Sequence, residues 1–297
     1  MSAPVTMKVP ASTANLGPGF DSLGLALNLY LTLEITPASK WHFEHRSPML
    51  AGLPNDETHL VYQAAKKTAD TYGGTLPPLH IVMDSDIPLA RGLGSSAAAI
   101  AAGIELADRY ANLQLSDQEK LLIGNQIEGH PDNIGASLFG GMVAGVSFGN
   151  DEADMVQLSV PDVDIVVLIP SYEVKTSDAR NVLPESFTRP QAVEASAVAN
   201  VLLAALSVGN YELVGKMMEK DQFHEPYRLQ LIKELPEARR LAKQAGAYAT
   251  VISGAGPTIL TLTPKGTGAD IVSVFRDYFT DCDVKQLAIH SGKIQCK

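Results

Sequence analysis

The chain has 297 residues and a formal net charge of −10, with 45% hydrophobic and 19% charged residues. This length favours two domains, and the composition is typical of a globular enzyme. Lys and Arg form no cluster along the sequence, which argues against the basic surface that nucleic-acid binding requires. No apolar run reaches the ~20 residues of a membrane-spanning helix.

The cysteine content and the N-terminus indicate the compartment. Cys282 and Cys296 are the two cysteines, too few for a disulfide framework or a zinc site. Residues 1–8 lack the basic and apolar regions of a secretion signal. These features predict a cytoplasmic protein.

Strands and helices are predicted along the whole chain without a regular alternation. Runs of β-branched or alternating apolar residues predict strands over 5–9, 25–35, 41–44, 79–83, 142–147, 165–169, 248–252, 258–263 and 284–289. Periodicity and capping residues predict helices over 58–72, 95–110, 121–126, 192–206, 211–220, 236–245 and 271–278. This mixture favours an α+β fold over a doubly wound sheet.

The domain boundary is predicted near residue 160. Residues 149–162 are polar and acidic, and an apolar run begins at Ile165. We therefore predict an N-terminal domain over residues 1–160 and a C-terminal domain over residues 161–297.

The strongest local signal is a glycine loop, residues 88–99, which reads PLARGLGSSAAA. Gly92 and Gly94 permit backbone angles that a Cβ atom would block. Ser95 and Ser96 are expected to cap a helix whose first amides, together with its dipole, can bind phosphate. The loop lacks the Gly-Lys-Ser/Thr of a Walker motif and the Gly-x-Gly-x-x-Gly of a dinucleotide fold.

Two further motifs accompany the loop. Residues 10–24 read PASTANLGPGFDSLG, and residues 253–258 read SGAGPT. In this order and spacing, the three motifs resemble those of the GHMP kinases, and the resemblance extends over essentially the whole chain.

The resemblance implies a fold, cofactors and an assembly. It implies a two-domain GHMP kinase fold, with an N-terminal mixed sheet covered by helices and a C-terminal ferredoxin-like α/β sandwich. It also implies ATP and Mg²⁺ as cofactors, and a homodimer. The residues expected to bind ATP are Pro88, Leu89, Ala90, Arg91, Gly92, Leu93, Gly94, Ser95, Ser96, Ala97 and Ala98.

Within the family, the motifs are most similar to those of the members that phosphorylate L-homoserine in threonine biosynthesis. The supporting stretches are STANLGPGFD at 12–21, EGHPDN at 128–133, TSDAR at 176–180 and HEPYR at 224–228. The residues that the resemblance assigns to the acceptor site are Asn15, Asp21, His130, Asn133, Thr176, Arg180 and Arg228.

The chemistry of these residues suits an amino acid. Arg180 and Arg228 can hold a carboxylate in a forked geometry, while Asp21 and Asn15 can accept from an ammonium group. Taken alone, the two arginines also fit ordinary surface residues, and His130 fits a structural histidine in a turn before Pro131.

The resemblance also assigns catalytic roles. Ser96 is expected to bind Mg²⁺, with Glu128 as the carboxylate ligand or water in its place. Asn133 stands where sugar and mevalonate kinases carry a catalytic aspartate, and an amide cannot take a proton. Asn133 would therefore orient the hydroxyl group, whose proton passes to a γ-phosphate oxygen or to Asp21. Asp132 is expected to point elsewhere.

Three alternatives to this function can be considered. A different GHMP kinase would use another hydroxyl acceptor. A non-catalytic sensor with the same fold would be expected to carry a degraded phosphate loop, whereas Gly92, Gly94, Ser95 and Ser96 are all present. A dinucleotide-dependent oxidoreductase lacks its fingerprint here.

Overall fold

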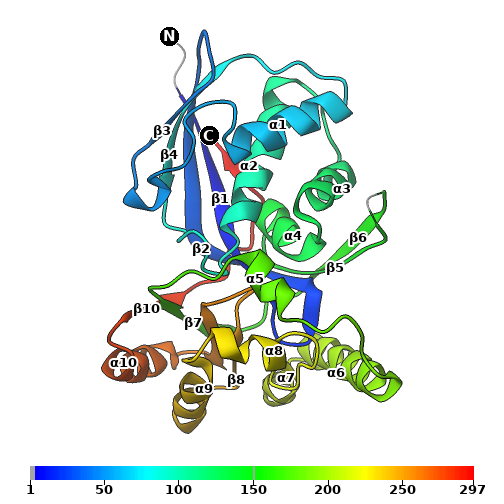
Figure 1. Ribbon diagram of the computed structural model, residues 1–297, viewed down its shortest axis with the longest axis vertical. Helices are drawn as coiled ribbons and strands as arrows, with labels where there is room; N and C mark the ends of the chain where they lie inside the picture. Colours follow the sequence, from blue (N-terminus) through cyan, green and yellow to red (C-terminus); the bar gives the residue numbers. More distant parts are fainter. Residues whose placement is uncertain (1–3, 150) are drawn as a thin grey trace.

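The computed structural model describes residues 4–149 and 151–297 and contains two sheets (Figure 1). The first sheet contains β1 (Val5–Asn15), β2 (Gly19–Pro37), β3 (His42–His45), β4 (Leu79–Ser85), β5 (Met142–Ser147), β6 (Ala153–Leu158) and β11 (Gln295–Cys296). The second contains β7 (Val163–Pro170), β8 (Ala249–Ile252), β9 (Ile259–Pro264) and β10 (Cys282–Leu287).

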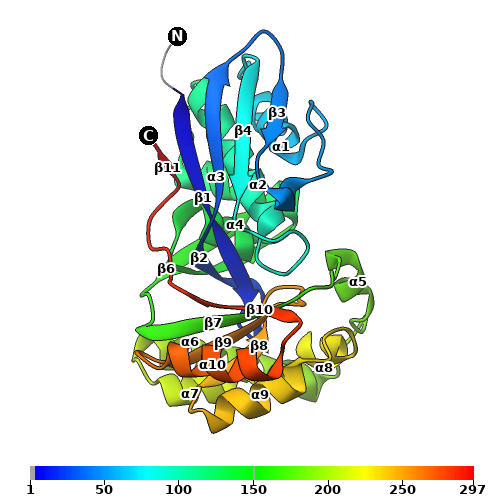
Figure 2. The ribbon, with the colours of Figure 1, turned by 90° about the vertical axis from the view of Figure 1, so that its left-hand side faces the viewer.

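Helices cover one face of each sheet (Figures 1 and 2). Beside the first sheet lie α1 (Leu60–Thr71), α2 (Ser95–Tyr110), α3 (Asp117–Glu128) and α4 (Pro131–Phe139). Beyond the second lie α6 (Arg189–Ser207), α7 (Tyr211–Met218), α9 (Leu235–Gln244) and α10 (Gly268–Tyr278). The short helices α5 (Thr176–Asn181) and α8 (Glu225–Arg228) lie near the junction of the two sheets. No helix in the described part of the chain is long and apolar enough to cross a membrane.

These sheets confirm the predicted α+β class. In the first sheet β3 and β4 are parallel and the other pairs are antiparallel, so the sheet is mixed. In the second, the order β10-β7-β9-β8 is antiparallel throughout. β7 is buried along its whole length, which explains its continuous apolar sequence.

The alanine-rich helix α2 fixes the glycine loop in place. Small side chains let the helix approach β1 and α1 closely, and Ala97, Ala98, Ala101 and Ala102 are fully buried. Because α2 is held along its length, its N-terminus presents the loop at a fixed position at the junction of the sheets.

Several short elements were absent from the sequence prediction. Helix α4 begins directly after His130, which is its N-cap residue rather than part of an isolated turn. Proline at the first helical position explains why the helix begins there. The polar stretch 149–162 contains the edge strand β6, whose alternation is weak because the apolar Val156 lies on its exposed side.

The division at residue 160 stays a prediction. Strand β7, the first of the second sheet, begins at Val163. The end of the chain returns to the first sheet, where β11 pairs with β1 and Ile289 forms a bridge with Leu27.

His59 provides a pH-dependent contribution to stability. Its Nδ1 accepts a hydrogen bond from the Val61 amide at 3.1 Å and caps α1, and its ring stacks on Phe43. Burial, with a smaller contribution from His45, lowers the pKa of His59 from 6.5 to about 4. The stabilisation is therefore complete above pH 6.5 and is lost as the pH falls towards 4.

We expect His59→Asn to unfold with a shallower acid dependence than the wild type. Asparagine also caps helices but does not titrate, and the difference across this range should reach at most about 3 kcal/mol. Urea unfolding at pH 7, 6, 5 and 4 measures it. Parallel losses of stability in the two proteins would contradict the assignment.

Candidate active site

A cavity of about 320 Å³ opens between the glycine loop and α5. The segments that surround it are the end of β1, the start of β2, the N-termini of α2 and α4, the end of α3, and α5 and α8. Its lining includes the predicted residues Asn15, Asp21, Ser96, Glu128, His130, Asn133, Thr176, Arg180 and Arg228. All the side chains assigned to the acceptor and to catalysis therefore meet in one place.

The glycine loop contributes part of its length to this cavity. Its lining residues are Ala90, Gly92, Gly94, Ser95 and Ser96, whereas Leu89 lines a neighbouring cavity. The loop residues Leu93, Ala97 and Ala98 are buried beneath it. They hold the loop rather than face a ligand.

The cap of α2 differs from the prediction that serines cap this helix. Gly94 is the N-cap residue, with φ of 69° and no side-chain cap, and Ser95 and Ser96 are the first helical residues. The left-handed conformation suits glycine. It leaves the first amides of α2 without an intrahelical partner or a side-chain cap, so they can bind a ligand.

Arg91 points away from the phosphate side of the loop. Its Nε donates to the Pro170 carbonyl at 3.2 Å, its Nη2 donates to the Ser171 carbonyl at 2.7 Å, and Glu173 lies 3.2 Å from Nη1. Arg91 therefore ties the loop to the segment after β7.

Ser96 and Glu128 form the pair that best fits Mg²⁺. The Ser96 hydroxyl donates to Glu128 Oε2 at 3.0 Å. Burial raises the pKa of Glu128, although His130 and the hydrogen bond from Ser96 oppose the shift. A cation would compensate for that burial, and paired oxygens are the ligands that Mg²⁺ prefers.

Arg180 and Asp21 form an ion pair at the wall of the cavity. The guanidinium donates to both carboxylate oxygens, at 2.8 and 3.1 Å, and both side chains are more than one-third exposed. Such an exposed pair contributes little to stability. A zwitterionic ligand could separate it at low cost.

Arg228 is fixed rather than mobile. It is 2% exposed; its Nε donates to the Ala179 carbonyl and its Nη1 to the Gly254 carbonyl. Burial lowers its pKa to about 10, with Arg180 adding to the shift. Arg228 therefore remains charged at neutral pH. Its burial excludes the alternative that Arg228 is an ordinary surface residue.

Asn15 already holds the backbone around the cavity. Its Nδ2 donates to the Gly254 carbonyl at 2.9 Å, and its Oδ1 accepts from the Asp21 amide at 3.1 Å. Asn15, Asp21 and Ala90 all have positive φ angles. Backbone strain of this kind concentrates at functional sites.

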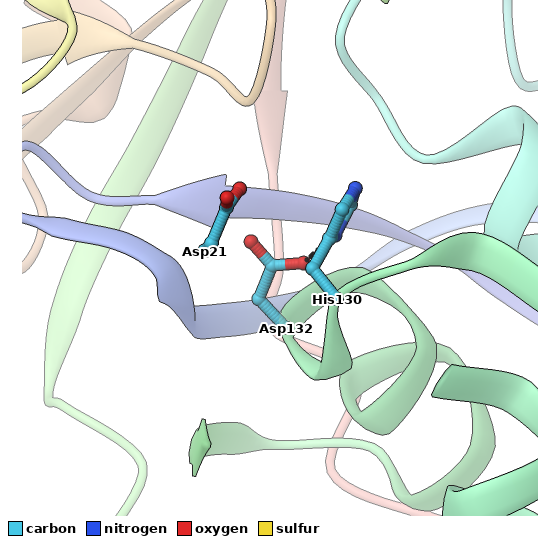
Figure 3. A group of neighbouring side chains, drawn as sticks. All are labelled: Asp21, His130 and Asp132. Atoms are coloured by element: carbon cyan, nitrogen blue, oxygen red, sulfur yellow. Dashed lines mark hydrogen bonds and ion pairs between the residues drawn. The ribbon is translucent and has the colours of Figure 1, made fainter. Parts of the chain in front are cut away.

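Asp132 was expected to point elsewhere, and that expectation is wrong. The α4 helix turns its side chain into the cavity, where Oδ1 lies 2.6 Å from His130 Nδ1 (Figure 3). Burial opposes the charge of His130, but Asp132, followed by Asp21 and Glu128, raises its pKa to about 9. His130 is therefore an imidazolium, with Nδ1 donating to Asp132.

Asp21, His130 and Asp132 each bring one candidate metal-ligand atom within 4.8 Å of the other two. Figure 3 shows the two carboxylates facing each other beside the His130 ring. Because the imidazolium nitrogens are both donors, this group suits an anion at His130 and a cation at the carboxylates.

We expect binding of the amino-acid acceptor that the sequence motifs imply to weaken above about pH 9, where His130 loses its charge. Asp132→Asn removes the main charge that raises this pKa, so the loss should begin at lower pH. KM for this acceptor between pH 6 and 10 measures the shift. The substrate's own ammonium titrates identically in both proteins, so coincident profiles would contradict the role of Asp132.

Asn133 is oriented by a residue that the sequence analysis did not single out. Ser12 Oγ donates to Asn133 Oδ1 at 2.9 Å and lies 3.2 Å from Ser137 Oγ. With its oxygen occupied, Asn133 is left with amide hydrogens to offer a ligand. Such a group can position a hydroxyl oxygen but cannot accept a proton.

A second cavity of about 310 Å³ lies on the other side of the loop. Its lining is mostly apolar and includes Leu50, Leu53, Met83, Ile87 and Ala99. Ser95 and Ser96 line both cavities. These apolar residues come from three separate segments of the chain. Each segment has the sequence pattern of an ordinary hydrophobic core, so the sequence alone does not reveal the cavity.

Comparisons with known proteins show the family of this chain. The profiles of the GHMP kinases N terminal domain and the GHMP kinases C terminal match residues 59–141 and 202–281. Homoserine kinase of Bacillus licheniformis is 53% identical over 96% of this chain and 92% of that protein. Homoserine kinase of Halalkalibacterium halodurans is 51% identical over 99% and 96%. The crystal structure of homoserine kinase from Cytophaga hutchinsonii has a TM-score of 0.87 at 27% identity, covering 100% and 98%.

Proposed function

Because the chain belongs to the GHMP kinase family, and homoserine kinases match nearly its whole length, we propose that it transfers the γ-phosphate of ATP to L-homoserine. The acceptor is the side-chain hydroxyl, and the product is O-phospho-L-homoserine, an intermediate of threonine biosynthesis. The observation that carries this proposal is the position of Ser95 and Ser96 between an apolar and a charged cavity.

The apolar cavity suits the base of ATP. Its lining buries a flat aromatic group without requiring charged partners. The triphosphate then crosses the N-terminus of α2, where free amides and the helix dipole stabilise its charge. The γ-phosphate is thereby directed into the charged cavity.

The charged cavity suits a zwitterion. The substrate carboxylate can replace Asp21 as the partner of Arg180, while the ammonium can replace Arg180 as the partner of Asp21. A single zwitterionic ligand can therefore pair with both Arg180 and Asp21 once their own ion pair is broken. A sugar offers neither charge, and mevalonate lacks the ammonium group.

The remaining residues position the reacting groups. Arg228 and His130 add positive charge for the carboxylate, and Asn133 orients the hydroxyl oxygen towards the γ-phosphate. Ser96 and Glu128 would hold Mg²⁺, which neutralises charge on the phosphate oxygens when bound. The hydroxyl proton passes to a γ-phosphoryl oxygen, because Asn133 cannot accept it and Asp21 is paired with the substrate ammonium.

A panel of acceptors at fixed ATP tests the proposal. We expect L-homoserine to give a higher kcat/KM than L-serine, L-threonine, mevalonate or galactose, with ADP release as the readout. A non-amino-acid acceptor with the higher value would favour a different GHMP kinase activity. We also propose a cytoplasmic homodimer, which sedimentation equilibrium and cell fractionation would test.

A further inference from the structure

The segment between β7 and α5 is fastened to the glycine loop. Arg91 holds the Pro170 and Ser171 carbonyls and lies beside Glu173, and the Val174 amide donates to the Ala90 carbonyl at 3.3 Å. The next residue, Lys175, is the N-cap of α5 and lines the charged cavity with Ser95 and Ser96. The contacts of Arg91 and Val174 therefore place the Lys175 backbone beside the phosphate loop, and the Lys175 side chain takes no part in them.

Lys175 differs from the other strong cations of the cavity. Arg180 is paired with Asp21, and Arg228 is tied to two carbonyl groups. Within residues 4–149 and 151–297, the Lys175 ammonium has no hydrogen-bond or ion-pair partner, and its side chain is exposed. Its three N–H donors can therefore bind a ligand without first breaking a contact within the protein.

The charges around the reacting phosphate leave a role for this cation. Asp21, Glu128 and Asp132 all line the cavity, and negative charge accumulates on the γ-phosphoryl oxygens during transfer. Arg180, Arg228 and His130 are engaged with the acceptor end in the proposed function. Lys175 directly follows Val174, whose amide donates to the loop residue Ala90, so it lines the cavity on the loop side, where the γ-phosphate would emerge.

We propose that Lys175 is a catalytic residue that donates hydrogen bonds to the γ-phosphoryl oxygens as the phosphate is transferred. This inference rests on the proposed kinase function. The acceptor oxygen forms a bond to the γ-phosphorus while the bond to the β–γ bridging oxygen breaks, and ADP leaves with that electron pair. The hydroxyl proton moves to a γ-phosphoryl oxygen, and Lys175 keeps its proton throughout.

Lys175→Met and Lys175→Arg test the role. Loss of one preorganised donor to a developing anion costs about 10²-fold in kcat, so we expect a loss of that size in Lys175→Met. KM for homoserine and the Kd of ADP should change less than about threefold, because neither ligand carries the transferred group. Lys175→Arg should recover most of kcat. Lys243→Met, an exposed lysine in the last turn of α9, is the matched control and should match the wild type.

The outcomes separate this inference from the proposed function. Wild-type protein without ATP-dependent phosphorylation of homoserine would remove the function itself. An active wild type with unchanged kcat in Lys175→Met would overturn the role of Lys175. A tenfold rise in KM for homoserine at constant kcat would also overturn it, because Lys175 would then bind the acceptor carboxylate.

Discussion

Gly94→Ala is expected to lower kcat/KM for homoserine by at least about 10²-fold, the scale of a catalytic group displaced by an ångström. A Cβ at this position would lie 2.1 Å from Ser12 Oγ and 3.0 Å from the Ser12 carbonyl oxygen. Ser12 holds Asn133 through its hydroxyl. The added methyl group must therefore move either the loop or the residue that orients the acceptor.

Gly209→Ala is the matched control for this substitution. Gly209 has the same φ of 69° as Gly94, but a Cβ there meets no atom within 4 Å. Both variants carry the backbone strain of alanine in the left-handed region, about 1–2 kcal/mol, and only Gly94→Ala carries the clash. The two variants are compared by steady-state kinetics after thermal melts show that both are folded. Equal kinetics in the two variants would show that the clash at residue 94 is relieved without loss of activity.

Glu128→Gln is expected to lower kcat by about 10²–10³-fold at fixed Mg²⁺, the range for loss of a group that stabilises transition-state charge. Glutamine keeps the size of the side chain and can still accept from Ser96, but it removes the negative charge that a cation requires. We also expect a higher Mg²⁺ concentration to be needed for half-maximal activity.

Glu185→Gln, on an exposed carboxylate outside both cavities, controls for the change in net charge. Titration of activity with Mg²⁺ after EDTA treatment gives both quantities. An unchanged Mg²⁺ requirement in Glu128→Gln would assign the metal to other ligands, with water among them.

Most of the fold and the composition of the acceptor site could be predicted from sequence. The long apolar strands, the alanine-rich helix after the loop and the individual strands of the second sheet have local patterns that tertiary contacts do not override. The residues assigned to the acceptor could be named because their short motifs, 224–228 among them, resemble those of a known family. The structure brings these residues into one cavity.

The remaining features depend on contacts between distant segments. Asp132 turns towards His130 because α4 begins at Pro131, a helix too short to leave a strong periodic signal. Arg91 resembles a phosphate ligand in sequence, but its guanidinium is drawn to carbonyl groups about 80 residues later in the chain, with separations of 79 and 80. The apolar cavity that we propose for the base combines residues from β4, α2 and the segment before α1, whose individual sequences are those of a hydrophobic core.

Phosphorus NMR of the wild-type protein with ATP, Mg²⁺ and L-homoserine tests whether the phosphate is transferred to homoserine. We expect a phosphate-ester resonance of O-phospho-L-homoserine that grows at the same rate as ADP and requires all three components. Release of inorganic phosphate with ADP, without an ester resonance, would contradict transfer to homoserine.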